Sequence, residues 1–199
     1  EKEIVYNSED MRIGQCTDLS MCAGDIENIW PLLHVKTRNA LRKGLNQGFV
    51  VNSDCEEWNF LKEKHFESMK RMDGVSKPEQ FFSKVPKYFA PEEQFRIWTA
   101  YSDGKPVSSI LLFYWGDSVE YFLPVVDLEF RSLQPLSCVI FEAMKDAVER
   151  GFTLWNWGGT WLSQKGVYRF KSRWNATDRE YRYFTQLNNF EIKGKDKQE

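Results

Sequence analysis

The residues best placed to carry out chemistry lie between Trp155 and Trp174. An aromatic stretch runs into the paired glycines Gly158-Gly159, and the segment that follows carries a tyrosine, three cations and a tryptophan (Tyr168, Arg169, Lys171, Arg173 and Trp174). Glycines permit a tight turn where a strand ends, and cations beside such a turn can hold an anion. This stretch therefore predicts a ligand-binding cleft built on a paired-glycine loop.

The tryptophans of this stretch admit two interpretations. Trp157 and Trp161 flank the glycine pair and are candidates, together with Gly158 and Gly159, for contacting the ring of a sugar or an adenine. Aromatic residues at this density also pack protein cores. The sequence leaves both interpretations open.

A second group of cations falls on one predicted helix and comprises Arg38, Arg42 and Lys43. Because arginine grips phosphate with two parallel hydrogen bonds, Arg38 and Arg42 are candidates for binding an anionic acceptor, such as a nucleotide-linked or phosphorylated sugar. The alternative is a solvent-exposed helix face whose charges pair in salt bridges.

The composition favours one folded domain, because 42% of the 199 residues are hydrophobic and such a chain can bury a core. We divide it into an N-terminal segment (residues 1–20), a main domain (residues 21–190) and a charged tail (residues 191–199). The N-terminal segment is interpreted as a remnant of a preceding domain. A formal charge of -2 and a pI near 5.9 argue against a broad nucleic-acid-binding surface.

Metal and disulfide chemistry are not indicated. The 4 cysteines form no CxxC pair and only 2 histidines are present, so neither a zinc site nor a disulfide framework is predicted. The longest strongly apolar run, Ile110 to Trp115, is far too short to span a bilayer, and no secretory signal pattern opens the sequence. A cytoplasmic location is the expectation.

The first half of the chain is predicted to be mainly helical. Apolar residues recur at helical spacing from Asp25 to Leu45, with Pro31 early in the first turn or at a kink, so a helix pair or a bent helix is expected. Two capping boxes predict two further helices, of which the second ends near Pro86 (Ser53 with Glu56, and Ser76 with Glu79).

Strand periodicity takes over in the middle of the chain. Three strands joined by tight turns are predicted, and a helix from Pro135 to Gly151 follows them (Phe95 to Tyr101, Val107 to Trp115 and Val119 to Val126). A strand, the glycine loop, a short helix and an aromatic-rich strand complete the domain, and short strands are expected near the N-terminus (Thr153 to Trp157, Asp178 to Leu187, Glu3 to Tyr6 and Arg12 to Cys16).

The order of these elements resembles the acyl-CoA N-acyltransferase (GNAT) superfamily, and the local motifs resemble its FemAB type. The resemblance covers roughly residues 18–187. Its motifs are a basic helix with the strand after it, a turn, the Pro135 helix, the glycine pair and a tyrosine-lysine segment (Arg38 to Lys43, Gly48 to Val51, Asp103 to Val107, Gly158-Gly159, Tyr168 to Lys171 and Trp174).

The resemblance implies an α/β (α+β) domain of GNAT-like fold, with a mixed, mostly antiparallel sheet flanked by helices. The strands around Val119 to Val126 and Thr153 to Trp157 are then parallel neighbours joined by the Pro135 helix. The implied activity is transfer of an acyl group of the acetyl type from acetyl-CoA, or another acyl-CoA, to an amine. The implied partner is a small-molecule or glycoconjugate acceptor, such as an amino sugar or a cell-envelope precursor, and no metal is expected.

The resemblance also assigns roles to three residues of the reaction centre. Lys171 is expected to stabilise developing negative charge, and Tyr168 to protonate the departing thiolate. Glu120 is a candidate general base if its side chain faces the cleft. The alternatives are a solvated helix cation, a tyrosine bonded to the backbone and an outward-facing carboxylate.

The donor site follows from the same resemblance. The backbone of Leu123, Pro124 and Val125 is expected to pair with the pantetheine arm of CoA, while Arg131, Gln134 and the start of the Pro135 helix meet the phosphates. The segment before Pro135 lacks the glycines of the usual GNAT pyrophosphate loop.

Two alternatives therefore stay open. The first is an aminoacyl-tRNA-dependent peptidoglycan aminoacyltransferase of the FemAB type. Such proteins usually carry two GNAT-like domains and often a coiled-coil arm, whereas this sequence has room for one domain and shows no long heptad segment, so tRNA is a less favoured partner. A non-catalytic GNAT-like binding module is the second alternative.

Overall fold

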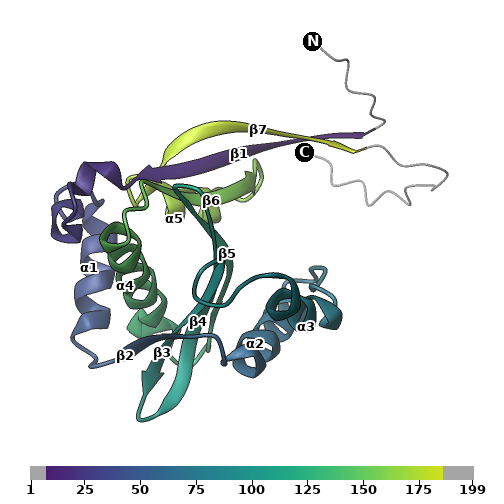
Figure 1. Cartoon of the computed structure of the whole chain (residues 1–199), viewed down its shortest axis with the longest axis horizontal. Helices are drawn as coiled ribbons and strands as arrows, with labels where there is room; N and C mark the ends of the chain where they lie inside the picture. Colours follow the sequence, from purple (N-terminus) through teal and green to yellow (C-terminus); the bar gives the residue numbers. More distant parts are fainter. Residues whose placement is uncertain (1–7, 186–199) are drawn as a thin grey trace.

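The chain folds around one seven-stranded sheet with the strand order β2-β3-β4-β5-β6-β1-β7 (Figure 1). The computed structural model describes residues 8–185. Neighbouring strands run antiparallel except β5 and β6, which run parallel, so the predicted mixed, mostly antiparallel sheet is confirmed. The strands are Ser8–Asp18 (β1), Val50–Asp54 (β2), Phe95–Ser102 (β3), Lys105–Trp115 (β4), Ser118–Val126 (β5), Leu154–Trp161 (β6) and Thr177–Thr185 (β7).

Helices cover both faces of this sheet. On one face α4 packs against β3, β4 and β5, and α1 packs against α4 from the outer side (Figure 1). On the other face α2 packs against β4 and β5, with α3 beside it. The helices are Val35–Leu45 (α1), Trp58–Arg71 (α2), Glu79–Tyr88 (α3), Pro135–Glu149 (α4) and Lys165–Ser172 (α5).

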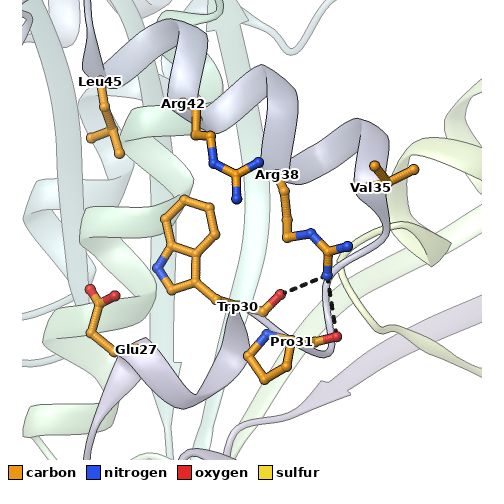
Figure 2. Close-up of a pocket in the computed structure, with 7 residues that line it drawn as sticks. All are labelled: Glu27, Trp30, Pro31, Val35, Arg38, Arg42 and Leu45. Carbon is orange, nitrogen blue, oxygen red and sulfur yellow. Dashed lines mark hydrogen bonds between the residues drawn. The ribbon is translucent and has the colours of Figure 1, made fainter.

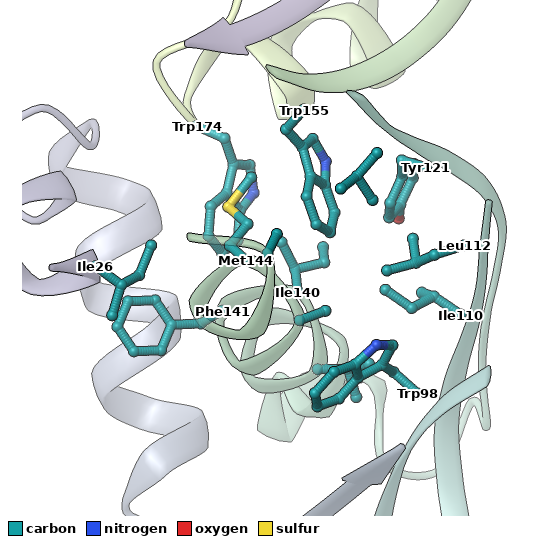
Figure 3. Packing of buried hydrophobic residues seen from close by; sticks show 14 of the residues in the cluster. Ile26, Trp98, Ile110, Leu112, Tyr121, Ile140, Phe141, Met144, Trp155 and Trp174 are labelled. Carbon is teal, nitrogen blue, oxygen red and sulfur yellow. The ribbon is translucent and has the colours of Figure 1, made fainter. Parts of the chain in front are cut away.

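Each face of the sheet has its own apolar core. The larger core lies between the sheet and α4, where Trp98, Ile140, Trp155 and Trp174 are buried together (Figure 3). The smaller core is formed by side chains of α2 and α3 against the opposite face of β3, β4 and β5. Burial on both faces explains why the central strands read as apolar with few polar interruptions.

The parallel strands β5 and β6 are joined by α4, as predicted. Pro135 stands at the first turn of α4, where its missing N–H costs no helical hydrogen bond. The ladder between the two strands is short, since only Ser118 to Glu120 pair with Leu154 to Asn156. Beyond Glu120 the two strands no longer pair, and this separation positions the candidate site.

The helical stretch predicted from Asp25 to Leu45 is broken into two pieces. A 3-10 helix, Ile26–Ile29, comes first, and α1 begins only at Val35. The chain turns between them at Pro31, which cannot donate a backbone hydrogen bond. His34 caps the N-terminus of α1, because its Nδ1 accepts a hydrogen bond from the backbone N–H of Lys36 at 3.1 Å.

Both predicted capping boxes are wrong. Ser53 lies inside β2 opposite Trp98 of β3, and α2 begins at Trp58 without a side-chain cap. Pro78 rather than Ser76 precedes α3, and α3 continues through Pro86 to Tyr88. Sheet pairing satisfies the backbone of β2 over more residues than a local cap does, and therefore decides the conformation there.

The predicted N-terminal strand from Arg12 to Cys16 is part of a longer one. β1 lies between β6 and β7 and pairs antiparallel with both, so this segment belongs to the same sheet as the main domain. The expected strand from Glu3 to Tyr6 and the charged tail lie outside the described residues. Within residues 8–185, no helix is long and apolar enough to cross a membrane.

Candidate active site

Glu120 stands where β5 and β6 separate. It is the last residue of β5 that pairs with β6, opposite Asn156. Its carboxylate has no hydrogen-bond partner within residues 8–185. Burial raises the pKa of Glu120 to about 7, although attraction to the Lys171 ammonium opposes the rise. A carboxyl group with this pKa exchanges its proton near neutral pH, as a general base must.

Lys171 lies on the inner face of α5 and is 6% exposed. Its ammonium donates hydrogen bonds to the hydroxyl of Thr160 at 2.8 Å and to the backbone carbonyl of Gly158 at 3.3 Å. An ammonium has three donors, and the third finds no acceptor within residues 8–185. Burial lowers the pKa of Lys171 to about 8, against the opposing attraction of Glu120. The lysine is therefore a buried cation with one donor left for a ligand.

Gly158 lies between these two groups. The predicted glycine loop is wrong, because Gly158 and Gly159 are part of β6, at an irregularity in its pairing with β1. Gly158 adopts φ +69°, and its N–H donates to the side chain of Asn156 at 2.9 Å. A Cβ at this position would lie 3.3 Å from Oε1 of Glu120. The glycine thus lets the strand pass close to the carboxylate while its carbonyl holds Lys171.

These residues form an arrangement suited to acyl transfer to an amine. A buried carboxylate can take the proton of an attacking amine, and a buried ammonium can stabilise the oxyanion of a tetrahedral intermediate. Both effects are stronger where water is partly excluded. The structure brings Glu120 and Lys171 together around Gly158, and their catalytic roles stay predictions.

Tyr168 occupies a different position on α5. Its hydroxyl donates a hydrogen bond to Asp178 of β7 at 2.8 Å on the exposed surface. That bond to the Asp178 carboxylate raises the pKa of Tyr168. To protonate a leaving group, Tyr168 would have to give up this bond, and its catalytic role stays a prediction.

The strand segment predicted to contact pantetheine presents an unpaired edge. Leu123, Pro124 and Val125 pair with β4 on one side, whereas the side towards β6 pairs with no strand of residues 8–185. Backbone groups on such an edge are available to an extended ligand. The position expected for the donor arm is thus compatible with the fold.

The segment predicted to bind phosphates is less open. Arg131 begins a short 3-10 helix, and Gln134, at φ +67°, leads directly into Pro135 of α4. Many of its backbone N–H groups already donate to acceptors within the segment (those of Glu129, Phe130, Arg131, Leu133, Gln134 and Ser137). Few backbone donors are left for a pyrophosphate, which agrees with the missing glycines.

Arg38 and Arg42 line a separate surface groove of about 700 Å³ (Figure 2). Arg38 donates hydrogen bonds to the backbone carbonyls of Trp30 at 3.2 Å and Pro31 at 3.4 Å. The guanidinium of Arg42 lies 5.7 Å from the centre of the Trp30 ring. Because α4 stands between α1 and the sheet, the structure does not bring these arginines to Glu120 and Lys171.

The tryptophans divide between the two interpretations. Trp157 is 2% exposed, and its indole N–H donates to Thr17 at 2.9 Å, so it packs in the core. Trp161 is 46% exposed, and the Arg12 guanidinium lies 4.2 Å from the centre of its ring. Only Trp161 of this pair is open to a ligand.

The sequence interpretation missed Asn156 and Thr160. These side chains hold the Gly158 N–H and the Lys171 ammonium, respectively. The sequence did carry a signal for these two residues, because they are polar side chains within an otherwise aromatic and glycine-containing strand. No group of histidine, cysteine, aspartate and glutamate side chains within residues 8–185 is arranged to hold a metal ion.

Comparisons with known proteins bear on the fold and the family of this chain. A family model described as an acetyltransferase (GNAT) domain matches residues 35–172. FemX has a similar structure, with a TM-score of 0.76 at 15% identity over 87% of this chain and 61% of FemX. A search of curated proteins found no significant match.

Two further structures share the fold. The C-terminal domain of a putative lysylphosphatidylglycerol synthetase from Agrobacterium fabrum gives a TM-score of 0.58 at 12% identity, covering 88% of this chain and 60% of that one. An aminoglycoside acetyltransferase from an uncultured soil metagenomic sample, in complex with sisomicin, gives 0.54 at 13% identity, covering 72% and 99%. The chain spans about three fifths of the length of FemX and of the synthetase domain.

Proposed function

Because the chain belongs to the family of acetyltransferase (GNAT) domains, we propose that it transfers an acyl group from an activated donor to an amine, with Glu120 as the general base and Lys171 as the stabiliser of the oxyanion. The observation that carries this proposal is the placement of both buried groups around Gly158, at the separation of β5 and β6.

The chemistry follows from the positions of these two groups. The amine nitrogen attacks the acyl carbon while Glu120 takes its proton, and the carbonyl electron pair moves to oxygen. The free donor of the Lys171 ammonium stabilises that oxyanion. Collapse of the intermediate restores the carbonyl and expels the leaving group, which then takes up a proton. Tyr168 is the candidate donor of that proton.

The proposed donor is acetyl-CoA or another acyl-CoA. The unpaired edge of β5 at Leu123 to Val125 supports an extended pantetheine arm, and the N-terminus of α4 favours phosphate through its dipole. Gln134 and Arg131 stand at that helix end.

A second candidate donor, aminoacyl-tRNA, is favoured by one specific observation. The segment before α4 uses most of its backbone N–H groups internally, so it offers a pyrophosphate less than a glycine-rich loop does. The structural similarity to FemX also favours aminoacyl-tRNA, because the resemblance to FemAB-type proteins implied this donor as an alternative. A non-catalytic binding module is the remaining alternative, and the buried charges at the site argue against it, because such charges destabilise a fold that does not use them.

The proposed acceptor is an amine on a small molecule or glycoconjugate, such as an amino sugar or a cell-envelope precursor, with a cytoplasmic reaction as the working expectation. Glu120 needs an acceptor that presents its amine beside Gly158. The groove of Arg38 and Arg42 lies on another face and is proposed as an accessory anion site.

The test supplies each donor in turn with a panel of amines. The protein is incubated with radiolabelled acetyl-CoA or with charged tRNA, and transfer is followed by mass spectrometry of the amines. We expect transfer from one donor, at a rate that Glu120→Gln lowers about a hundredfold or more. Transfer from charged tRNA alone would select the second candidate. If the folded protein transfers an acyl group from neither donor, the proposal is contradicted.

A further inference from the structure

A surface of phenylalanine rings begins beside Glu120 and is not used by the chemistry proposed above. Its members come from β4, from β5 and from α3 with the residue that follows it (Phe81, Phe89, Phe113 and Phe122). Phe89 is 41% exposed, and the other three side chains are half-buried. We call this the phenylalanine surface.

The rings of the phenylalanine surface contact one another in a continuous series. The centre of the Phe113 ring lies 5.0 Å from that of Phe89 and 5.2 Å from that of Phe122. The Phe122 ring in turn stacks on Phe81 with 5.6 Å between the ring centres. Phe81, Phe113 and Phe122 border the smaller core, and because each is only half-buried, part of each side chain stays accessible.

The register of the sheet places this surface next to the candidate base. Phe113 of β4 stands directly opposite Glu120 of β5. Side chains directly opposite in an antiparallel pair point to the same face, with Cβ atoms about 4.5–5.5 Å apart. An irregularity in the ladder at Leu111 and Leu112 leaves Phe122 as the extra residue of β5, and its contact with Phe113 puts its ring on this face too. An amine at Glu120 therefore has the Phe113 ring as its neighbour.

The phenylalanine surface attracts cations but offers no hydrogen bond. The Lys77 ammonium lies 5.1 Å from the centre of the Phe122 ring and 5.9 Å from that of Phe81. A cation near a ring face is attracted by the negative charge of that face, so these rings already hold one ammonium. Phenylalanine lacks the polar atom of tyrosine and tryptophan. The hydroxyl groups of a sugar would therefore lose hydrogen bonds to water here without replacing them.

We propose that the phenylalanine surface binds the body of the acceptor and selects an amine attached to an aromatic or other apolar group over an amino sugar. This proposal rests on the proposed acyl transfer and narrows its acceptor. The Glu120 carboxylate attracts the ammonium group, while the ring of an arylalkylamine packs against Phe113 and Phe89. Contacts between aromatic rings add about two- to tenfold in affinity beyond the burial of apolar surface.

The test measures amine binding without any acyl donor, so it needs no turnover. Signals of isotope-labelled phenylalanine rings are followed by NMR while phenethylamine or glucosamine is added. We expect phenethylamine to bind about tenfold more tightly than glucosamine and to shift the signals of Phe113 and Phe89. Phe113→Leu and Phe89→Leu should each weaken phenethylamine binding about two- to tenfold, because leucine is apolar but lacks the ring.

The matched control is Phe152→Leu. Phe152 is also half-buried, but it packs against the larger core on the other face of the sheet, with its ring 5.2 Å from that of Tyr114. This variant should bind phenethylamine like wild type. Thermal melts check that every variant is folded, and the exposed Phe89 supplies the decisive variant if Phe113→Leu is unstable.

Three results would overturn the proposal. Wild type would bind neither amine, or it would bind glucosamine as tightly as phenethylamine, or the folded variants of the phenylalanine surface would bind phenethylamine as tightly as Phe152→Leu does. Failure of the proposed function has a different signature. In that case phenethylamine would bind as expected, yet the protein would transfer no acyl group to it from either donor.

Discussion

Replacing Glu120 by glutamine tests the electrostatics of the site without knowledge of a substrate. Burial raises the pKa of Glu120 from 4.5 to about 7, so between these pH values the folded state holds a proton that the unfolded state releases. Stability is therefore lost as pH rises through this window. Glu120→Gln carries no ionisable group here, so its stability should not show that loss.

The size of the effect follows from the same shift. At 1.36 kcal/mol for each pH unit, a rise from 4.5 to about 7 corresponds to about 3.4 kcal/mol. Glu120 keeps part of its contact with water, and screening reduces this to about 1.5–2 kcal/mol. Relative to wild type, Glu120→Gln should gain that much unfolding free energy between pH 4.5 and pH 8.

Urea unfolding of both proteins at several pH values measures this gain. Glu149→Gln, which removes an exposed carboxylate from α4, controls for the loss of a negative charge elsewhere. If the difference between Glu120→Gln and wild type is the same at pH 4.5 and pH 8, Glu120 is solvated like a surface carboxylate. The reasoning about the site would then be refuted.

Three further predictions concern packing, a buried histidine and catalysis. Gly44→Ala should lower the free energy of unfolding by about 1–3 kcal/mol, because its Cβ would lie 2.5 Å from the Cys138 sulfur and 2.8 Å from the Gln134 carbonyl oxygen. The control Gly166→Ala adds its Cβ in open space and should not destabilise the protein. Equal melting temperatures for the two variants would contradict this prediction. His65 is kept neutral by burial, which lowers its pKa, so stability should fall as pH drops below 6.5, and His65→Gln should flatten that dependence in acid unfolding curves. Lys171→Met should lower turnover on the order of a hundredfold with little change in donor affinity. Lys171→Arg should restore little of that turnover, because the planar guanidinium places its charge elsewhere. Full turnover in Lys171→Met would show that the lysine has only a structural role.

The sequence predicted the elements whose signals are local and long. Alternating apolar residues and tight turns located β3, β4 and β5, and Pro135 with Gly151 marked both ends of α4. It failed where long-range pairing decides the conformation. Gly158 was predicted in a loop because two adjacent glycines favour turns. In the structure β1 pairs with β6 on both sides of an irregularity in the register, so the glycines stay within the strand.

In the candidate site, too, local sequence signals were readable and the effects of long-range packing were not. The resemblance assigned a base to Glu120 and a charge-stabilising cation to Lys171, and the fold brings both side chains near Gly158, although their roles stay predictions. Burial of Lys171 was not predictable from α5 alone, because neighbouring cations at Arg169 and Arg173 have the same local pattern. The arginines of α1 were predicted to bind an acceptor from charge alone, whereas helix packing places them behind α4.

The most direct test of the central claim is the pH dependence of turnover once a donor and an amine are identified. Glu120 must be deprotonated and Lys171 protonated, so the rate of wild type should rise through about pH 7 and fall above about pH 8. In Glu120→Gln the rate should be at least roughly a hundredfold lower, and the rising limb should disappear. A variant that keeps the wild-type rate and the same rising limb would contradict the assignment of Glu120 as the base.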